Sequence, residues 1–596
     1  MSASTAHSWT AGERLVALMA GAASLLLLTA TLTTGLASTM AGHGWHAPSH
    51  ADAPAVIRQW PRHALHPREA YPAELQPLLP GPVLMWTALS LTLALLAGLG
   101  IAGWRLSRPL RTGLAGGAND PATSSKGLAS HRDLRQHLSD SAVRGRAAQV
   151  RPSLAGTGRY PTRALGLALG SDLSTGMQLW GSVEDSYLVL GPPRSGKGVH
   201  LVIPHTLDAS GPVLVTSTRP DTFHATHTAR SQQGPVLTFD PQQLAPDAPR
   251  LRWSPTRGCE DPLIAINRAR ALSAGTGLNQ ADSGGDYWQQ MICAVLRSYL
   301  HAAALTGRSV REILAWASRP TDPTPIRILK TETGAAPGWA EELAAQSAAD
   351  PRQRDGVWSG IRRAVDSLAD PRVLDTCSPT RDDAFDPSSF LRNHGTLYLL
   401  GTTGAQLSVA PLITALLEDL LDTARTLAAG ASHGRLDPPL LLLLDEAANI
   451  APIPTLPNLL ADGGGTGITT VVVLQSLAQA RSRWGTSGAD AMWDAATTKV
   501  VLGGLAHADD LQRISRLAGE IDLPHLTRNH GSGGAGHSLT TRRLPALPLE
   551  RIRCLPAGQA LVLARRCPPA QVRLTPWWQH PSQSKNAIRA GRRSSA

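Results

Sequence analysis

The sequence predicts an α/β protein whose doubly wound parallel sheet is interrupted by an all-helical insert and preceded by two apolar helices. Three observations predict this fold class. Short apolar runs recur between turn residues in two separate parts of the chain, the part between them has helical spacing, and two long apolar stretches lie near the N-terminus. The 596 residues are enough for two or three domains, so the length fits this division.

Residues 1–110 are predicted to form a membrane anchor with two transmembrane helices, over about 15–37 and 82–104. Each stretch would be roughly 34 Å long as a helix, enough to cross a hydrocarbon core of about 30 Å. A cleaved signal peptide is the alternative for the first stretch, but the stretch is long for one and a second follows it. Three arginines follow the second stretch directly: Arg105, Arg108 and Arg111. They indicate a cytoplasmic side, so we expect both termini in the cytoplasm, an external loop over 38–81 and a location in a bacterial inner membrane.

Two basic segments flank the main body of the chain. Residues 111–158 are rich in Ser, Ala, Gly and Arg without a sustained apolar period, which predicts a basic, flexible linker. Residues 577–596 are predicted to be a basic, disordered tail. The formal net charge of +11 and the sequence pI near 9.9 favour polyanionic partners.

The sheet domain is predicted to comprise residues 159–253 and 388–576. Its strand candidates, each closed by turn residues, lie at 187–190, 213–215, 236–239, 395–400, 440–444, 469–474, 499–502 and 559–563. Residues 254–387 are predicted to be an all-helical insert. Helical spacing occurs there over 287–305, 310–317, 339–349 and 357–368. Four tryptophans of the insert are assigned to core packing in preference to base stacking: Trp288, Trp316, Trp339 and Trp358.

A glycine-rich turn follows the first strand candidate. It consists of Gly191, Pro192, Pro193, Arg194, Ser195, Gly196, Lys197 and Gly198. Such a turn lets backbone N–H groups converge on phosphate oxygens, and the following helix adds its positive dipole end. Lys197 is expected to reach the β- and γ-phosphates of a nucleotide. Gly198 stands where Ser or Thr normally contacts Mg²⁺, and an ordinary strand-to-helix turn is the alternative when the motif is taken alone.

Two carboxylates end the most apolar strand candidate. Asp445 and Glu446 follow the five leucines of 440–444, as at the carboxyl edge of a buried parallel strand, where α/β sheets bind ligands. Asp445 is expected to hold Mg²⁺, directly or through water, and Glu446 to polarise the attacking water. Gln475 ends the next strand and is a candidate sensor of the γ-phosphate, the alternative being a solvent-facing polar residue. With the glycine-rich turn, these residues predict a P-loop site for ATP and Mg²⁺ in which Lys197, Glu446 and Gln475 are catalytic.

The five cysteines are scattered and never form CxxC or Cys/His pairs. This spacing favours reduced, buried thiols in a cytosolic body over a disulfide framework or a zinc site.

The chain resembles the TraG/TraD-like coupling ATPases of type IV secretion and bacterial conjugation, which are P-loop NTPases with a TraM-recognition-type domain. The resemblance covers the two N-terminal stretches and nearly all of 160–570. Beyond the glycine-rich turn and the Asp445-Glu446 pair, it rests on short segments: Val202-Ile203-Pro204, the turn at Asp221, Asp286-Tyr287-Trp288-Gln289 and Leu474-Gln475-Ser476-Leu477-Ala478-Gln479. The helical insert lies between the two nucleotide motifs, as in that family.

The resemblance implies a RecA-like P-loop NTPase sheet domain and a membrane-anchored, DNA-translocating ATPase that forms a homohexamer at the base of a secretion channel. It implies as partners the inner membrane, the channel subunits, a relaxase and the single-stranded DNA that the relaxase carries. The helical insert is implied to recognise cargo.

One departure concerns the arginine that a neighbouring subunit of a hexameric motor supplies to the site. In the coupling family a basic residue often lies in the stretch that matches 462–467, and this chain has no Lys or Arg there. Four other arginines stay open as candidates: Arg481, Arg483, Arg513 and Arg516.

Three other functions stay open. The first is a coupling receptor for protein effectors only, and the second is an FtsK/HerA-like translocase of double-stranded DNA. The third is a membrane scaffold with a degenerate nucleotide site, which Gly198 and the missing basic residue keep open.

Overall fold

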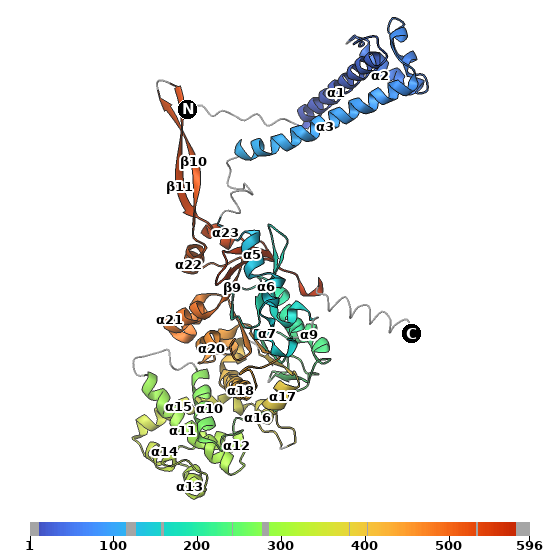
Figure 1. Cartoon of the computed structure of the whole chain (residues 1–596). Coiled ribbons are helices and arrows are strands. Elements are labelled where there is room, and N and C mark those ends of the chain that lie inside the picture. Colours follow the sequence, from blue (N-terminus) through green and yellow to red (C-terminus); the bar gives the residue numbers. More distant parts are fainter. Residues whose placement is uncertain are drawn as a thin grey trace, which may run out of the picture. The chain divides into compact units, whose positions relative to one another are not determined.

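The protein is described from a computed structural model. The structure describes residues 11–49, 51–114, 127–155, 160–240, 242–276, 285–380, 382–401, 403–531 and 534–579. The chain divides into two compact units, Met1–Ser124 and Ser125–Ala596 (Figure 1). Each unit is described by itself.

Two long helices make up most of the first unit. They are α1 (Ala11–Met40) and α3 (Pro82–Leu114). Between them lie α2 (Ala53–Gln59) and the 3-10 turns η1 (Trp60–His63), η2 (Pro67–Ala70) and η3 (Gln76–Leu78). A small core ties these elements together, since buried Tyr71 accepts a 3.0 Å hydrogen bond from Thr34 of α1 and packs in the same cluster as Met85 of α3. The segment predicted as a loop is therefore partly helical and packed.

The two predicted transmembrane spans are not supported. Both segments, 15–37 and 82–104, lie within helices α1 and α3. However, among the residues that the structure describes, no helix is long and apolar enough to cross a membrane. In α1 hydroxyl groups interrupt the leucines from residue 29 onward, and they bond carbonyls one turn earlier, as Thr29 does with Leu25 at 2.7 Å.

The second unit is built on an eleven-stranded mixed sheet with the order β2-β1-β13-β12-β9-β3-β8-β7-β4-β6-β5. The strands are β1 (Gly166–Asp172), β2 (Gln178–Ser182), β3 (Tyr187–Leu190), β4 (Val213–Ser217), β5 (Val236–Phe239), β6 (Thr396–Leu400), β7 (Leu440–Leu444), β8 (Ile468–Leu474), β9 (Thr498–Leu502), β12 (Gln559–Ala564) and β13 (Ala570–Arg573). The strands from β9 to β5 in this order are parallel, and β12, β13, β1 and β2 continue the sheet with antiparallel pairs. The predicted α/β class is confirmed, although the sheet is mixed and not only parallel.

Each face of the sheet belongs to a different core. In β7 the side chains of Leu440, Leu442 and Leu444 enter one cluster, and those of Leu441 and Leu443 enter the other. Successive side chains of a strand point to opposite faces, so a strand covered on both faces must be apolar throughout. This explains the uninterrupted run of five leucines.

The helices of the second unit cover these faces and the carboxyl edge. Near its N-terminal end and around the first strands lie α5 (His131–His137), α6 (Asp140–Arg144), α7 (Ala147–Val150), η4 (Pro152–Leu154), η5 (Thr162–Ala164), η6 (Gly198–Val202), α8 (Ile203–Asp208) and α9 (Asp221–Arg230). After β6 follow α18 (Thr403–Ala429), α19 (Ala447–Ile450), α20 (Leu456–Asp462), α21 (Leu477–Ala495), α22 (Ala508–Ala518), α23 (Leu549–Arg553) and η9 (Trp577–Gln579).

The predicted flexible linker over 111–158 is wrong for its second half. Helices α5 to α7 are folded there, with Leu134, Val143 and Val150 buried against the sheet domain. Ser130 caps α5 and forms a capping box with Asp133. This helix signal is present in the sequence, but the surrounding Ser and Arg residues indicate a linker more strongly. Residues 115–126 of the linker and 580–596 of the predicted tail lie outside the described residues.

Between β5 and β6 the described chain is helical. It forms α10 (Pro262–Gly275), α11 (Gly285–Leu305), α12 (Val310–Ser318), α13 (Thr324–Thr331), α14 (Trp339–Ser347), α15 (Pro351–Val365), η8 (Asp366–Ala369), α16 (Pro371–Thr376) and α17 (Pro387–Arg392). Figure 1 shows α10 to α15 gathered on one side of the sheet domain. Three of the four tryptophans are buried as predicted, whereas Trp288 is 40 % exposed.

The helical part is attached to the sheet domain through α18. Asp419 of α18 accepts a 2.8 Å hydrogen bond from Trp253 Nε1 and lies 2.7 Å from Arg268 of α10, and all three side chains are buried. Gly275 ends α10 so close to α18 that an added Cβ would lie 2.4 Å from Pro411 Cα. The two helices therefore pack backbone to backbone at this point.

A long hairpin was not predicted. It consists of β10 (Glu520–Gly531) and β11 (Gly534–Pro545), which pair along their whole length from Glu520↔Pro545 to Gly531↔Gly534. In Figure 1 the hairpin projects away from the sheet beyond α22 and α23. Its sequence is rich in His, Gly, Arg and Thr and contains Pro524, so it lacks the apolar alternation by which a strand is predicted.

Candidate nucleotide-binding site

The glycine-rich turn joins β3 to the helix that follows it. Its first residue is fixed to the sheet, because Gly191 N–H donates a 3.0 Å hydrogen bond to Leu474 O at the end of β8. Arg194 and Gly196 have left-handed backbones with φ of 64° and 88°. Left-handed residues between right-handed ones aim successive N–H groups at a common point, which is the arrangement that binds phosphate. An added Cβ on Gly191 would lie 2.7 Å from Ser195 Oγ, so the turn closes tightly on itself.

The helix after the turn begins with a π-helical turn. Residues Gly198–Val202 form η6 and Ile203–Asp208 continue as α8. The N–H groups of the first turn have no carbonyl partner within the helix and carry its positive dipole end. Pro192 and Pro193 contribute no N–H, so the donors of the turn come from Arg194 onward. A Cβ on Gly198 would meet nothing within 4 Å, so the structure has room for the hydroxyl side chain that this position lacks.

The parallel register brings the two predicted motifs to one edge of the sheet. β8 lies between β3 and β7, with Leu190 opposite Leu474 and Leu444 opposite Val472. The turn after β3, Gln475 after β8 and Asp445-Glu446 after β7 thus follow the carboxyl ends of three neighbouring strands. The predicted Lys197 and carboxylates are therefore brought together.

Lys197 and Asp445 interact electrostatically. Lys197 is 9 % exposed, and the Oδ1 oxygen of Asp445 is fully buried. Burial raises the pKa of Asp445 to about 6, while Lys197 opposes this rise and Glu446 adds to it. Burial disfavours the ionised form of this carboxyl group and the neighbouring lysine favours it. A bound cation would stabilise the ionised form further, which suits the carboxylate to metal binding.

The two other predicted catalytic side chains lie beside each other. Gln475 Nε2 is 3.5 Å from Glu446 Oε1. Glu446 has a left-handed backbone with φ of 53° and is the residue before α19, so the chain turns sharply just after the metal-ligand candidate. Thr216, at the end of β4, donates a 2.7 Å hydrogen bond to Asp445 O. Thr216 was not predicted as a site residue, because its place beside Asp445 follows only from the pairing of β4 with β7.

The residues present fit a magnesium nucleotide. Two buried side-chain oxygens, Ser195 Oγ and Asp445 Oδ1, have no hydrogen-bond partner within the described part of the chain. The described residues contain no group of three or more His, Cys, Asp or Glu side chains that could enclose a metal by itself. Mg²⁺ is usually held by one or two carboxylates together with substrate phosphates and water, so Asp445 and Glu446 with a bound triphosphate would suffice.

The arginine candidates are mostly engaged within the chain. Arg481 pairs with Asp510 at 3.2 Å, Arg513 pairs with Asp490 at 2.6 Å, and Arg483 donates to Gly275 O at 3.3 Å. Arg516 is exposed on α22. The glycine-rich stretch 462–467 precedes β8, so it lies at the opposite end of that strand from Gln475.

This fold and site define a class of protein, the RecA-like P-loop nucleotide-binding domains, in which a glycine-rich turn and a carboxylate pair face each other across one intervening strand. A family model described as "Type IV secretory system Conjugative DNA transfer" matches residues 162–254, which include the turn. A second, described as "TraM recognition site of TraD and TraG", matches residues 439–557, which include the carboxylates. The predicted resemblance to the TraG/TraD-like coupling proteins is thereby confirmed.

Solved structures show the same fold. The unbound conjugative coupling protein TrwB is 19 % identical over 71 % of this chain and 91 % of its own, with a TM-score of 0.52. TrwB in complex with ADP and Mg²⁺ is 18 % identical over the same shares, also with a TM-score of 0.52. TrwB with the ATP analogue ADPNP is 19 % identical over 66 % of this chain and 86 % of its own, with a TM-score of 0.50. No curated protein sequence matches the chain.

Replacing Asp445 by Asn is expected to stabilise the nucleotide-free chain at alkaline pH. The folded chain holds the Asp445 proton more tightly than the unfolded chain does, because the pKa is about 6 against an ordinary value of 3.8. The ionised carboxylate therefore destabilises the fold above pH 6, and two pKa units correspond to about 3 kcal/mol. Urea unfolding without nucleotide or Mg²⁺ should show a gain of about 3 kcal/mol at pH 8 and about half of this at pH 5.

The exposed Asp247→Asn is the matched control and should change the unfolding free energy little at either pH. An equal gain for Asp445→Asn at pH 8 and pH 5 would contradict the assigned protonation.

Proposed function

We propose that the protein is an ATPase that couples a relaxase–DNA substrate to a type IV secretion channel and drives single-stranded DNA transfer during conjugation. The observation that carries this proposal is the meeting of Lys197 with Asp445 at the edge where β3, β8 and β7 end. One family model matches the part of the chain that contains Lys197, and the other matches the part that contains Asp445, so each covers one half of the site.

The proposed substrate is ATP with Mg²⁺. TrwB, which shares the fold, is described in complex with ADPNP and with ADP and Mg²⁺. Bound Mg²⁺ would neutralise charge on the β- and γ-phosphates. In this chain the turn from Gly191 to Gly198 binds the phosphates, Lys197 contacts the β- and γ-oxygens, and Asp445 with Glu446 holds the metal directly or through water.

The hydrolytic step is assigned to the residues after β7 and β8. Glu446 orients and polarises the attacking water, because its carboxylate follows the buried strand that ends at the phosphates. Gln475 lies 3.5 Å from the Glu446 carboxylate, so a change at the γ-phosphate reaches β8 and then α21 through this contact. The arginine that completes the site in a hexamer is left open, with Arg516 the exposed candidate.

The proposed partners follow from the same matches. The conjugative DNA transfer model supports relaxase-bound single-stranded DNA and channel subunits as partners, and the TraM recognition model supports a relaxosome component. A homohexamer is proposed because a P-loop motor of this kind acts on a polymer as a ring. The second candidate, a receptor for protein effectors only, keeps the same ATPase and differs in DNA affinity.

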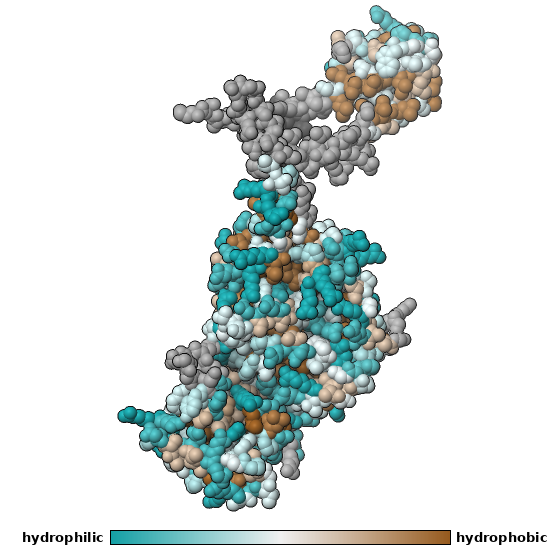
Figure 2. All heavy atoms as spheres, turned by 60° about the vertical axis from the view of Figure 1, so that its left-hand side comes forward, coloured by the Kyte–Doolittle hydropathy of each residue, from teal (hydrophilic) through white to brown (hydrophobic). Residues whose placement is uncertain are grey.

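The proposed location is the bacterial inner membrane, with both termini in the cytoplasm. Its support is the apolar surface of the first unit, where the exposed large apolar side chains of α1 and α3 include Leu25, Leu26, Val83, Leu91, Leu93 and Leu95. Figure 2 shows this surface as a brown band across the unit. Contiguous apolar surface of this kind marks a contact with a membrane or a partner protein.

Lys197→Ala and Glu446→Gln are expected to lower ATP turnover by on the order of 100-fold or more, because each removes a charged group that acts on the transferring phosphate or the attacking water. Glu446→Gln should still bind ATP, whereas Lys197→Ala should bind it more weakly. Phosphate release and equilibrium ATP binding, measured on the full chain, separate the two effects.

The matched controls are Lys330→Ala and Glu341→Gln, which change the same residue types at exposed positions of the helical part. Turnover in the controls should stay within about twofold of the wild type. Full hydrolysis by either site variant would refute the assigned roles.

Single-stranded DNA is expected to bind with an affinity that falls steeply as salt rises, since each neutralised phosphate releases counterions and contributes about −0.7 to the slope of log K against log salt. Fluorescence anisotropy with labelled oligonucleotides between 50 and 200 mM salt, values typical of such measurements, gives this slope. Absent or salt-independent binding would favour the receptor for protein effectors, and a preference for duplex over single strands would favour the double-strand translocase.

The exposed leucines of α3 are expected to hold the chain in the membrane fraction. Replacing Leu91, Leu93 and Leu95 by Ser should release a larger share of the chain from washed membranes, because each buried leucine contributes about 2 kcal/mol on transfer from water. Replacing Leu173, Leu263 and Leu517, which are exposed in the second unit, by Ser is the matched control and should release none. Equal release by both triple variants, or a wild-type chain recovered without membrane, would refute the location.

A further inference from the structure

A polar cavity lies at the edge of the sheet opposite the glycine-rich turn. Its volume is about 550 Å³, which is within the range of pockets that bind small molecules. It is lined where β3 and β9 begin and β12 ends, at the point where Thr498 pairs with both Tyr187 and Ala564. The four residues of β3, at about 3.3 Å each, put roughly 13 Å between this edge and the turn that carries Lys197. The cavity is therefore separate from the nucleotide-binding site of the same chain.

A smaller cavity of about 260 Å³ adjoins the first one. The two cavities share four lining residues, which are Thr497, Ala564, Arg565 and Cys567. The turn after β12 is fixed to the sheet, because Arg565 N–H donates a 3.0 Å hydrogen bond to Thr497 O. Cys567 N–H donates to Ala564 O at 3.2 Å and closes this turn. The backbone of Arg565 is thus held in place between the two cavities.

Three arginines line the larger cavity. Arg565 and Arg566 come from the turn after β12, and Arg146 comes from the turn between α6 and α7. None of the three guanidinium groups forms an ion pair or a side-chain hydrogen bond within the described residues. A cavity lined by like charges concentrates the field of these charges and attracts ions of the opposite sign.

Three acids also line the two cavities, but each has a partner other than these arginines. Asp185 accepts a 2.7 Å hydrogen bond from Ser182 N–H, Glu184 lies 3.3 Å from Arg435, and Asp494 lies 3.8 Å from Arg513. Burial raises the pKa of Asp185, and the Ser182 bond and the more distant charge of Arg146 oppose this rise. The acids therefore leave the three guanidinium groups available to a ligand.

Lys499 adds a fourth cation, in the smaller cavity. Its Nζ atom donates a 2.6 Å hydrogen bond to Ala496 O. Burial lowers the pKa of Lys499 to about 8, Asp494 opposes this shift, and the positive charges of Arg565 and Arg513 add to it. A bound anion would reduce the repulsion between these cations and favour the charged form of the lysine.

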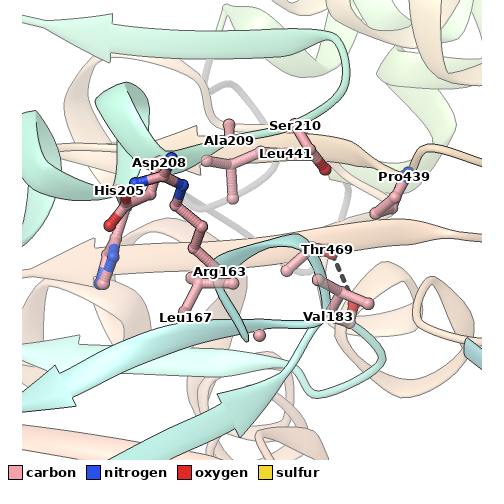
Figure 3. Close-up of a pocket in the computed structure, with 11 residues that line it drawn as sticks. Arg163, Leu167, Val183, His205, Asp208, Ala209, Ser210, Pro439, Leu441 and Thr469 are labelled. Atoms are coloured by element: carbon pink, nitrogen blue, oxygen red, sulfur yellow. Dashed lines mark hydrogen bonds and ion pairs between the residues drawn. The ribbon is translucent and has the colours of Figure 1, made fainter. Parts of the chain in front are cut away.

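Figure 3 shows the contrasting case of a cavity whose arginine has an acidic partner. In that cavity, of about 30 Å³, Arg163 lies 3.9 Å from Asp208, and Thr469 donates a hydrogen bond to Val183 O. The volume is enough for water but not for an organic ligand. These polar groups bond within the chain, whereas the three arginines of the larger cavity have no such partner in the described part of the chain.

We propose that the two joined cavities form a second anion site, in which Arg146, Arg565 and Arg566 bind a small ligand with two or more phosphate groups. A guanidinium group pairs with phosphate oxygens through two N–H donors. Several cations at one place match a ligand with several negative charges, and a single carboxylate would leave most of them uncompensated. The phosphates come either from a soluble polyphosphate compound or from the headgroup of a lipid with two phosphates, such as cardiolipin. The site does not depend on the proposed ATPase function, because it shares no residue with the nucleotide-binding site.

The test measures pyrophosphate binding without Mg²⁺ by isothermal titration calorimetry on the full chain. All measurements use the Lys197→Ala background, which removes the lysine of the nucleotide-binding site, and pyrophosphate should still bind there. Arg565→Gln combined with Arg566→Gln should weaken this binding by about tenfold or more, because both replacements remove charged donors to phosphate. Arg146→Gln should weaken it several-fold. All three side chains are exposed, so the variants should fold, as circular dichroism would verify.

The matched control replaces a consecutive pair of exposed arginines on α15, Arg362→Gln combined with Arg363→Gln, and the affinity should stay within about twofold. This control changes the net charge by the same amount. An equal loss in the control would overturn the site, because net charge alone would then explain the effect. Unchanged affinity in the Arg565 and Arg566 variant, or no pyrophosphate binding in the Lys197→Ala background, would also overturn it.

The source of the phosphates is identified with the chain reconstituted in phosphatidylcholine vesicles with and without cardiolipin. Weaker pyrophosphate binding in the presence of cardiolipin would assign the site to the lipid headgroup, since the two ligands would compete for the same arginines. Equal binding in both kinds of vesicle would assign it to a soluble phosphate compound.

Discussion

The site depends on one constraint, that β3, β8 and β7 run in parallel and end at the same edge of the sheet. This alignment places a lysine from one loop against a carboxylate from another, although Lys197 and Asp445 are far apart in the chain. Each charge makes the burial of the other tolerable: without Lys197 the desolvated Asp445 would favour its proton even more strongly. The site is thus held ready for a ligand that carries both anionic oxygens and a divalent cation.

The strands of this edge could be predicted from sequence because each combines an apolar run with turn residues at its end. The antiparallel extension could not. β1 contains two glycines and a bulge opposite β2, and β13 is only four residues long, so neither shows a recognisable period. The hairpin of β10 and β11 was missed for a different reason: its strands pair along their whole length, but their sequence lacks the apolar alternation that predicts a strand. Helices α5 to α7 were concealed by a basic, small-residue composition that is typical of linkers.

The candidate site was predictable in its residues and not in its environment. The glycines, the lysine and the pair of acids at strand ends can be recognised directly in the sequence. The burial that shifts the Asp445 pKa, the bond from Thr216 and the contact between Gln475 and Glu446 all require neighbours that are distant in sequence. The cavity of about 460 Å³ beside His200 is the clearest example of an environment that the sequence does not reveal. Its walls come from β1, β2, α8 and the segment after β13, and no local sequence pattern connects them.

The five leucines of β7 do not by themselves determine the register of this strand against its neighbour β8. If β7 shifted by one residue along β8, its leucines would exchange faces and both cores would remain equally apolar. The free energy of apolar burial alone therefore hardly distinguishes the two registers. The distinguishing marks lie at the two ends of β7, where Pro438 and Pro439 precede it and the acids follow. Pro cannot donate within a ladder and a carboxylate cannot enter a dry sheet interior without a partner. The two acids to which we assign the chemistry therefore also help to fix the register of β7. Exchanging them for apolar residues would remove the proposed site and also weaken the specification of the register.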